Sequence, residues 1–488
     1  MNVMESDKMD EIQPPSIPDD VYPLHAMDNN PNYVDWVMRF NDALDAQMLK
    51  DSLSRLLEIG NWRKFGGRFR YNSNGKLEIH VPGSSAGDRE NVSFTHNIVD
   101  SSIQDHPVAR NLPVRTDGPS LHLLSTNFRP FIARPNFPKF EELTRHDIPP
   151  ISVHVTSFNN ATIVALAWPH HLMDAMGGKA LLAAWSSVLA GQEDEVPEVV
   201  GAREDILQHP EIAAEDDEEF ILEKSRLTGG TLLMFHLRFL WDSLWNGSRE
   251  KRVIFLPKAS FEKMKARAQQ EISASAPNTY PAPFASENDI LTAWITRAFA
   301  SSEPNSRPIT VLNLLNLRFR IPLLFRSTGV FIQNICIGTY TFLSSRVAQG
   351  PVGQIALVNR QHTAEQGTDK QARKLLRSLV QDTEAGRSPR ILFGPTDGLF
   401  LVVNNVIKIE LMKTANFAPA VLRQGEESGT RSNPLGTMVS YFNESLDHMY
   451  DYFNAFLIFG KDHADNYWLG GALLPRAWKV MEEELRKL

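Results

Sequence analysis

The feature that most constrains the fold is an almost wholly apolar run at residues 161–168, Ala-Thr-Ile-Val-Ala-Leu-Ala-Trp. A strand with so few polar positions must be covered on both faces, as the central strand of a helix-flanked sheet is. Residues 151–158, just before it, alternate apolar and polar side chains, which is typical of a half-buried strand. Asn159 and Asn160 supply the turn between the two runs. The pair predicts a layered α/β core.

Further strands and helices are predicted on both sides of this pair. The periodicity and turn residues predict helices at residues 44–59, 286–299 and 475–488, a hairpin at 69–81, and strands at 309–317, 330–342, 399–403 and 455–459. The helix at 286–299 opens with Ser286-Glu287-Asn288-Asp289, which is a capping box. Strands that alternate with helices again indicate an α/β protein.

The chain has 488 residues, which is more than one hydrophobic core commonly serves. Acidic residues dominate residues 192–219 and predict an exposed linker there. We therefore expect a first domain at 1–200, an acidic linker at 201–225 and a second domain at 226–488. A segment near 415–445 is left free to pack with the first domain.

Composition excludes several classes of function. The net charge of −8 disfavours a nucleic-acid binder, which would usually be basic. Cys336 is the one cysteine, so an internal disulfide and a zinc site of several cysteines are excluded. No cluster of metal ligands is apparent, and we expect no metal. Residues 1–20 lack the apolar core of a secretory signal, so a cytoplasmic protein is expected. A monomer is expected as well.

The longest apolar stretch, residues 232–245, is interrupted by His236, Arg238 and Asp242. It is too short and too charged to span a bilayer. We expect an amphipathic helix packed against the core, with a membrane anchor as the alternative.

The candidate for chemistry lies at the end of the apolar strand, where residues 168–178 read Trp-Pro-His-His-Leu-Met-Asp-Ala-Met-Gly-Gly. His170 and Asp174 are four residues apart in what we expect to be a loop at residues 169–178, before a helix that ends near Gly191. Loops at strand ends are where open sheets place their chemistry. A neutral imidazole there can take a proton from an attacking alcohol or amine. Taken alone, His-x-x-x-Asp is a weak signal, because many proteins contain it by chance.

The match does not stand alone, because other segments at the intervals of one family accompany it. These are Tyr22-Pro23-Leu24, Gly66-Gly67-Arg68, Ser286-Glu287-Asn288-Asp289, Asn316-Leu317-Arg318, Gln333-Asn334 and the hairpin from Gly460 to Gly470. Together with the residues around His170 they resemble the BAHD acyltransferases, relatives of chloramphenicol acetyltransferase. The surroundings of His170 look most like the branch of fungal secondary metabolism. The resemblance runs from about residue 20 to the end.

The resemblance implies two chloramphenicol-acetyltransferase-like α/β domains, each a mixed sheet flanked by helices, with the active-site channel at their interface. It selects His170 as the general base, because the family sets its histidine four residues before the aspartate. His171 is then a neighbour. Asp174 is implied to be structural and to pair with Arg318 of the second domain, although an ordinary strand-end salt bridge would explain Arg318 equally well. Asn316 is implied to support the same region.

One motif departs from the family pattern. The second signature, Asp-Phe-Gly-Trp-Gly in the family, is matched here by Asn416-Phe417-Ala418-Pro419-Ala420. Asn416 can accept a hydrogen bond but cannot form an ion pair. Ala418 and Ala420 cannot adopt glycine-only backbone angles cheaply. In the family this motif supports the architecture, so its change weakens the support expected here. It also makes an altered or lost activity an alternative.

The implied reaction is direct transfer of an acyl group from acyl-coenzyme A, a co-substrate rather than a bound cofactor, to a hydroxyl or amine of a small natural product. Thr437 is a candidate oxyanion donor. No acyl-enzyme is expected, because no activated serine or cysteine is evident. Two alternatives stay open: a cyclisation that uses His170 without coenzyme A, and a catalytically silent binding protein.

Overall fold

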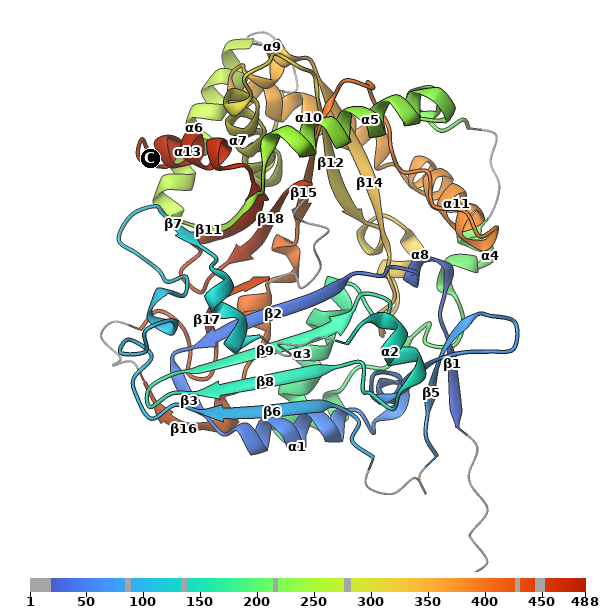
Figure 1. Ribbon diagram of the computed structural model, residues 1–488, viewed down its shortest axis with the longest axis vertical. Coiled ribbons are helices and arrows are strands. Elements are labelled where there is room, and N and C mark those ends of the chain that lie inside the picture. The colour runs from blue at the N-terminus through green and yellow to red at the C-terminus, as the bar shows by residue number, and fades with distance from the viewer. Residues whose placement is uncertain are drawn as a thin grey trace, which may run out of the picture.

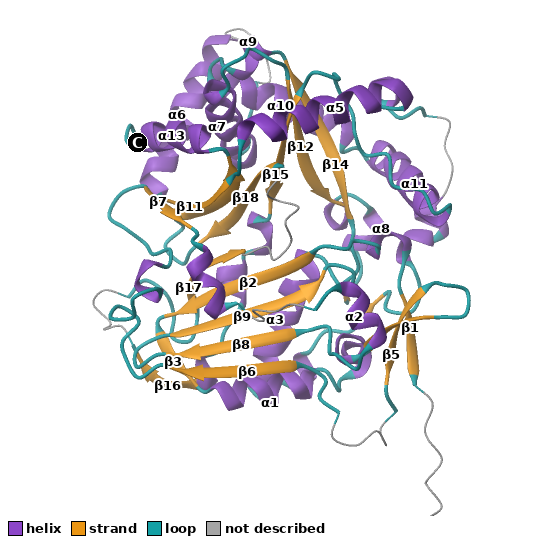
Figure 2. Cartoon of the chain, viewed as in Figure 1, coloured by secondary structure: helices purple, strands orange, loops and turns teal. Residues whose placement is uncertain are grey.

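The computed structural model describes residues 19–83, 89–132, 138–213, 218–275, 282–425, 431–443 and 453–488. Two large sheets dominate it, one below the other in the view of Figure 1, and helices cover them (Figure 2). In the described residues no helix has both the length and the apolar character that a bilayer-crossing segment needs.

The first sheet has five strands in the order β17-β2-β9-β8-β6. Their bounds are β17 Met438–Asn443, β2 Tyr33–Phe40, β9 Thr162–Pro169, β8 Ser152–Ser157 and β6 Ser93–Ile98. All neighbours are antiparallel except β6 and β8, so the sheet is mixed. β9 is central and buried at every position, as its apolar sequence requires.

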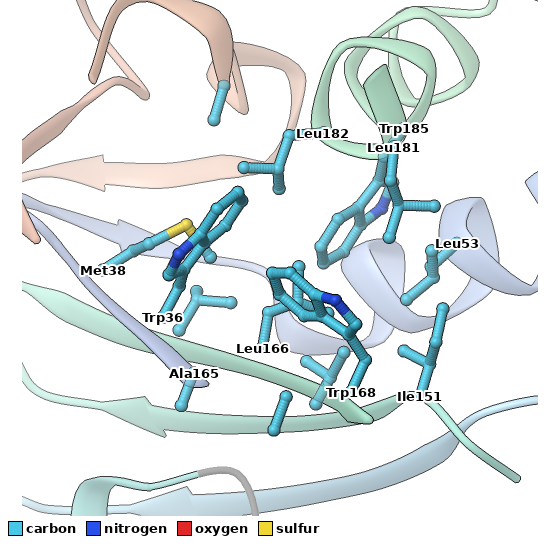
Figure 3. Close-up of a cluster of buried hydrophobic side chains, with 14 of the residues drawn as sticks. Trp36, Met38, Leu53, Ile151, Ala165, Leu166, Trp168, Leu181, Leu182 and Trp185 are labelled. Carbon is cyan, nitrogen blue, oxygen red and sulfur yellow. The ribbon is translucent and has the colours of Figure 1, made fainter. Parts of the chain in front are cut away.

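Helices α1 (Ala46–Leu56) and α3 (Ala175–Leu189) pack together against this sheet. Figure 3 shows Trp168 of β9 and Trp36 of β2 facing Leu181 and Trp185 of α3. The rings of Trp36 and Trp168 meet edge to face, with their centroids 4.8 Å apart. The end of β9, from which His170 emerges, therefore rests on a rigid aromatic core.

The second sheet has seven strands in the order β14-β12-β15-β18-β19-β11-β7. Their bounds are β14 Cys336–Leu343, β12 Ile309–Asn316, β15 Leu399–Asn405, β18 Asn454–Lys461, β19 Tyr467–Leu473, β11 Glu250–Leu256 and β7 Ser120–Leu123. β12, β15 and β18 are parallel to one another, and the other pairs are antiparallel. Its main core is shared with helices α6 Lys258–Ser275, α7 Glu287–Ser302, α10 Val352–Gln366 and α13 Pro475–Leu485. The expectation of two mixed sheets flanked by helices is confirmed.

Each sheet includes a strand from the other half of the chain. β7 comes from the first half and pairs with β11 in the second sheet. β17 comes from the second half and pairs with β2, and β16 (Val421–Gln424) pairs with β3 (Asp42–Leu44). β16 and β17 lie in the segment near residues 415–445 that was left free to pack with the first domain, whereas the placement of β7 was not expected.

The remaining elements are shorter or peripheral. They are β1 Asp20–Pro23, β4 Arg68–Tyr71, β5 Leu77–Val81, β10 Val199–Val200, β13 Val330–Phe331, α2 Phe140–Arg145, α4 Pro210–Ala213, α5 Gly229–Asn246, α8 Pro322–Phe325, α9 Ser345–Ala348, α11 Asp369–Glu384 and α12 Leu411–Thr414. β10 pairs with β13, so Val199 and Val200, just before the expected linker, contact a strand from the second half of the chain.

Three sequence-based expectations need correction. The loop expected at residues 169–178 is shorter, because α3 begins at Ala175 with Asp174 as its N-cap. The strand expected at 330–342 is broken into β13 and β14, with an irregular segment between them. Residues 232–245 do form a helix, α5, but it does not bury its apolar residues in the core, since Phe235 is its one buried residue.

Candidate active site

His170 follows directly after β9, and its backbone is fixed on both sides. Its N–H donates to the carbonyl of Asn32 at 2.7 Å, and its own carbonyl accepts from the Asn334 amide at 2.8 Å. Asn32 precedes β2 and Asn334 precedes β14, so the two bonds come from the two halves of the molecule. Because one residue is held by both halves, its position depends on how they dock.

His170 opens into a pocket of about 130 Å³ between the two sheets. One wall comes from β2 and β17, and the opposite wall comes from β15, β18 and β19. Pockets between domains are common sites of ligand binding. The Nδ1 atom of His170 is buried and has no hydrogen-bond partner among the described residues. The backbone and the pocket walls therefore hold the imidazole, rather than a side-chain acceptor on Nδ1.

Asp174 is the N-cap of α3 and is buried. Its Oδ1 accepts from the backbone N–H groups of Met176 and Gly177, both at 3.0 Å, which satisfies two otherwise unpaired donors of the first helical turn. A Cβ on Gly177 would lie 2.7 Å from the carbonyl oxygen of Ile332. Glycine here therefore serves close packing of α3 on the segment before β14, and not a tight bend.

Arg318 lies against the same carboxylate from the second sheet. It sits in the 3-10 turn Leu317–Phe319 after β12, and its Nη1 and Nη2 atoms donate to Oδ2 and Oδ1 of Asp174 at 2.7 and 3.1 Å. The side chains are 9% and 6% exposed, so this two-pronged ion pair is nearly dry. Removing the two charges from water costs free energy. The hydrogen bonds that Asp174 and Arg318 make here offset that cost.

The arginine also organises the irregular segment between β13 and β14. Its guanidinium donates to the carbonyls of Phe331 and Gln333, at 2.8 and 2.7 Å from Nη2. Asn316 caps the turn from the other side, because its Oδ1 accepts from the Arg318 N–H at 3.0 Å. The break between β13 and β14 thus has a cause: its carbonyls turn inward to the guanidinium instead of continuing a ladder.

Asn334 extends this arrangement to a second buried carboxylate. Its backbone and side-chain N–H groups donate to Oδ1 of Asp28 at 2.8 and 3.1 Å. Burial raises the pKa of Asp28, with nearby Lys64 opposing this, and burial lowers the pKa of Lys64. Both side chains are 1% exposed. Asn334 therefore links the buried Asp28 carboxyl group to the carbonyl of His170.

His171 points away from this arrangement into an aromatic cluster. Its ring stacks on Phe140, with centroids 4.0 Å apart, and meets Phe69 edge to face. Burial, with a smaller effect from the charge of His170, lowers its pKa to about 4. His171 is therefore a neutral packing residue at physiological pH.

Cys336 lies beside the ion pair, with Sγ 3.8 Å from Oδ2 of Asp174. Burial, reinforced by the Asp174 carboxylate, raises its pKa far above the usual range. The thiolate is the nucleophilic form of cysteine, so this thiol is a poor nucleophile.

The region of the altered second signature lies away from the pocket and packs on the first sheet. Phe417 is fully buried and contacts the rings of Phe40 and Trp185. The Asn416 Oδ1 accepts from the N–H of Ala418, so it caps the turn Ala418–Ala420. Neither alanine has a positive φ, so the loss of glycine costs no backbone strain here.

Asn416 is therefore not brought to His170, and neither is Thr437, the candidate oxyanion donor. Its hydroxyl donates to the carbonyl of Pro434 at 2.7 Å and accepts from Asn433, and it is absent from the pocket wall. The pocket instead contains the side chains of Asn443 on β17 and Asn404 on β15. The Oδ1 of Asn443 is buried without a partner among the described residues. Nothing in their local sequence distinguishes these asparagines, because they reach the pocket through strand pairing over long sequence separations.

In the described part of the chain, no three histidine, cysteine, aspartate or glutamate side chains are grouped so as to hold a metal ion.

Comparison of the sequence with known proteins shows the family of this chain. The model of the Transferase family matches residues 31–410. The O-acetyltransferase PaAT-2 of Phomopsis amygdali is 33% identical over 96% of this chain and 98% of that relative. The acetyltransferase pyiB of Pyricularia grisea is 32% identical over 96% and 94% of the two chains.

A solved structure shares the fold at low sequence identity. The TRI101 protein of F. graminearum, crystallised with coenzyme A and T-2 mycotoxin, has a TM-score of 0.65 at 14% identity and covers 96% of this chain and 98% of its own. The expected fold, with mixed sheets flanked by helices, is thus confirmed.

Proposed function

This chain belongs to the Transferase family of BAHD-type acyltransferases, and on that basis we propose that it transfers an acetyl group from acetyl-coenzyme A to a hydroxyl group of a small natural product. The observation that carries the proposal is His170, anchored by both halves of the molecule at a pocket between them. The curated relatives named above are acetyltransferases, one of them an O-acetyltransferase, which favours acetyl as the group and oxygen as the acceptor.

In the proposed reaction the His170 imidazole takes the proton of the acceptor hydroxyl as its oxygen attacks the thioester carbonyl carbon. The C–O bond forms, and the carbonyl electrons move onto oxygen. The tetrahedral intermediate then collapses, the C–S bond breaks and the coenzyme A thiolate leaves. The imidazolium returns its proton to the thiolate, so the products are an acetyl ester, free coenzyme A and neutral His170.

We propose the Asn443 and Asn404 amides as sources of the hydrogen bond that stabilises the oxyanion. Both lie in the pocket wall with His170, on opposite sides of it. An amide N–H is a suitable donor, and the loss of one such donor commonly costs about 10²–10³ in turnover. Thr437 does not keep this role, because its hydroxyl is bonded to a backbone carbonyl.

The arrangement around Asp174 supports a positioning role and no direct chemistry. Its carboxylate accepts from Arg318 and from the first turn of α3, so its oxygens are occupied. We propose that this ion pair fixes the docking of the two halves and therefore the position of His170. Asn334, which bonds to the His170 carbonyl, adds a second fixed point.

The test supplies purified protein with acetyl-coenzyme A and a metabolite extract from a strain that lacks the gene. Release of the coenzyme A thiol and the appearance of a product heavier by one acetyl group are expected. Mild alkali cleaves an ester but leaves an amide intact, so it separates O- from N-acetylation. A binding protein without activity would be stabilised against heating by acetyl-coenzyme A and release no thiol. A cyclase would change a metabolite without consuming acetyl-coenzyme A.

A further inference from the structure

Helix α5 leaves a broad apolar stripe in solvent. Seven large apolar side chains on it are between 49% and 73% exposed: Leu233, Met234, Leu237, Leu240, Trp241, Leu244 and Trp245. They recur at spacings of three, four and one, which places them on one face of the helix. The two tryptophans alone leave on the order of 300 Å² in solvent, and the largest apolar patch of a typical monomer is about 300–600 Å². We call these seven residues the α5 stripe.

The opposite face of α5 fixes the helix to the second sheet. Phe235 and Phe239 contact the rings of Phe400 and Phe453. Asp242 accepts from Arg307 at 2.7 Å, so the one carboxylate of the helix is paired and directed inward. Figure 1 shows α5 as a long helix across the upper part of the molecule. The stripe is therefore a fixed surface that faces outward.

We propose that the α5 stripe binds the surface of an anionic phospholipid bilayer, with α5 lying flat in the interfacial layer. Such helices combine an apolar face of leucine and tryptophan with basic residues at its borders. His236 and Arg238 are exposed and border the stripe on its two sides, and no carboxylate of α5 faces outward with it. The positive charge of Arg238 at the border of the stripe therefore complements lipid phosphates.

A second copy of the chain fits the stripe less well. Leu233, Leu237, Leu240 and Leu244 follow the spacing of a coiled-coil seam, which another α5 would cover. That seam leaves Trp241 and Trp245 at its side, where their rings lie 5.6 Å apart. Tryptophan is enriched at the membrane–water interface, where a bilayer would cover the full width of the stripe.

The test is flotation of the full chain with vesicles of phosphatidylcholine, with and without about one third phosphatidylserine. The variant Leu240→Ser/Trp241→Ser/Leu244→Ser removes the centre of the stripe at exposed positions. A matched control, Ile98→Ser/Phe284→Ser/Leu422→Ser, removes three apolar side chains of comparable exposure (74%, 60% and 69%) elsewhere. We expect the wild type and the control to float and the stripe variant to bind roughly tenfold or more weakly.

Arg238→Glu tests the charge at the border. We expect it to weaken binding to the anionic vesicles several-fold, and to leave binding to the neutral vesicles nearly unchanged. Light scattering coupled to size-exclusion chromatography measures the oligomeric state of the wild type and of the stripe variant. The proposal would be overturned if the wild-type protein did not float with vesicles of either lipid composition. A wild-type dimer that the stripe variant converts to a monomer would overturn it too, since a second copy would then cover α5. The proposal would also be overturned if the control variant lost as much vesicle binding as the stripe variant.

Discussion

Arg318 Nη1 donates to Oδ2 of Asp174 at 2.7 Å across 144 residues of sequence, and this bond joins the two sheets beside His170. Asp174 also caps α3, so its replacement changes two interactions at once. Serine caps helices about as well as aspartate, whereas alanine loses about 1 kcal/mol at such a position. The variants Asp174→Ser and Asp174→Ala therefore separate the cap from the ion pair.

We predict that Asp174→Ser lowers the free energy of unfolding by about 3–5 kcal/mol, because Arg318 remains buried without its partner. Adding Arg318→Met should restore part of that loss, since no charge is then stranded. Chemical denaturation of the single and double variants gives the coupling energy directly. Additive losses would mean that the two side chains act independently, and Asp174 would then need another role.

The sequence indicated much of this framework for identifiable reasons. Residues 161–168 are apolar on both faces, so their burial in a central strand could be predicted. The start of α3 was placed too late, because Gly177 and Gly178 suggested a loop, whereas they allow α3 to pack against Ile332 and Trp36. Local sequence does not reveal such tertiary contacts.

Other features depended on partners far away in the chain. The placement of β7 in the second sheet is set by long-range pairing with β11. For the same reason Asn404 and Asn443 could not be chosen in advance, whereas His170 was singled out by the resemblance to one family together with its spacing to Asp174. An amphipathic helix packed on the core was expected at residues 232–245, and α5 (Gly229–Asn246) does form there, but the apolar pattern did not indicate which face is buried.

His171 gives a prediction about acid stability. Burial lowers its native pKa to about 4, while the unfolded chain gains this proton near 6.5. The unfolded state therefore binds more protons between these values, so the contribution is present above pH 6.5 and is lost as the pH falls towards 4. This amounts to at most about 3 kcal/mol. Relative to His171→Phe, the wild type should lose stability in this window, as measured by urea denaturation at several pH values. If the free energy of unfolding changed with pH in the same way in both proteins, the pKa of His171 would not be lowered in the native state.

Cys336 should be inert in the native protein. Burial and the Asp174 carboxylate raise its pKa, so a thiol reagent at pH 8 is expected to label it only after unfolding. Intact-protein mass spectrometry after mixing with acetyl-coenzyme A alone should likewise show an unchanged mass. A stoichiometric acetyl adduct would contradict direct transfer.

Asn334 is expected to position His170 rather than to contact the reacting groups. In Asn334→Ala both the His170 carbonyl and the buried Asp28 lose a donor, which should cost about 1–3 kcal/mol of stability. Turnover should fall while the affinity for acetyl-coenzyme A stays close to that of the wild type, as measured by calorimetry and steady-state kinetics. An equal loss of coenzyme affinity would place Asn334 in the binding surface instead.

The most direct test of the account compares turnover in His170→Ala and His171→Ala, with acetyl-coenzyme A and the acceptor identified from the extract. A positioned general base contributes about 10²–10⁴-fold, so His170→Ala should lose that factor in turnover while retaining its fold and its thermal stabilisation by acetyl-coenzyme A. His171→Ala should lose far less turnover, because its ring packs on Phe140 and does not reach the pocket. A His170→Ala variant with near wild-type turnover, or a larger loss in His171→Ala, would contradict the assignment of His170 as the base.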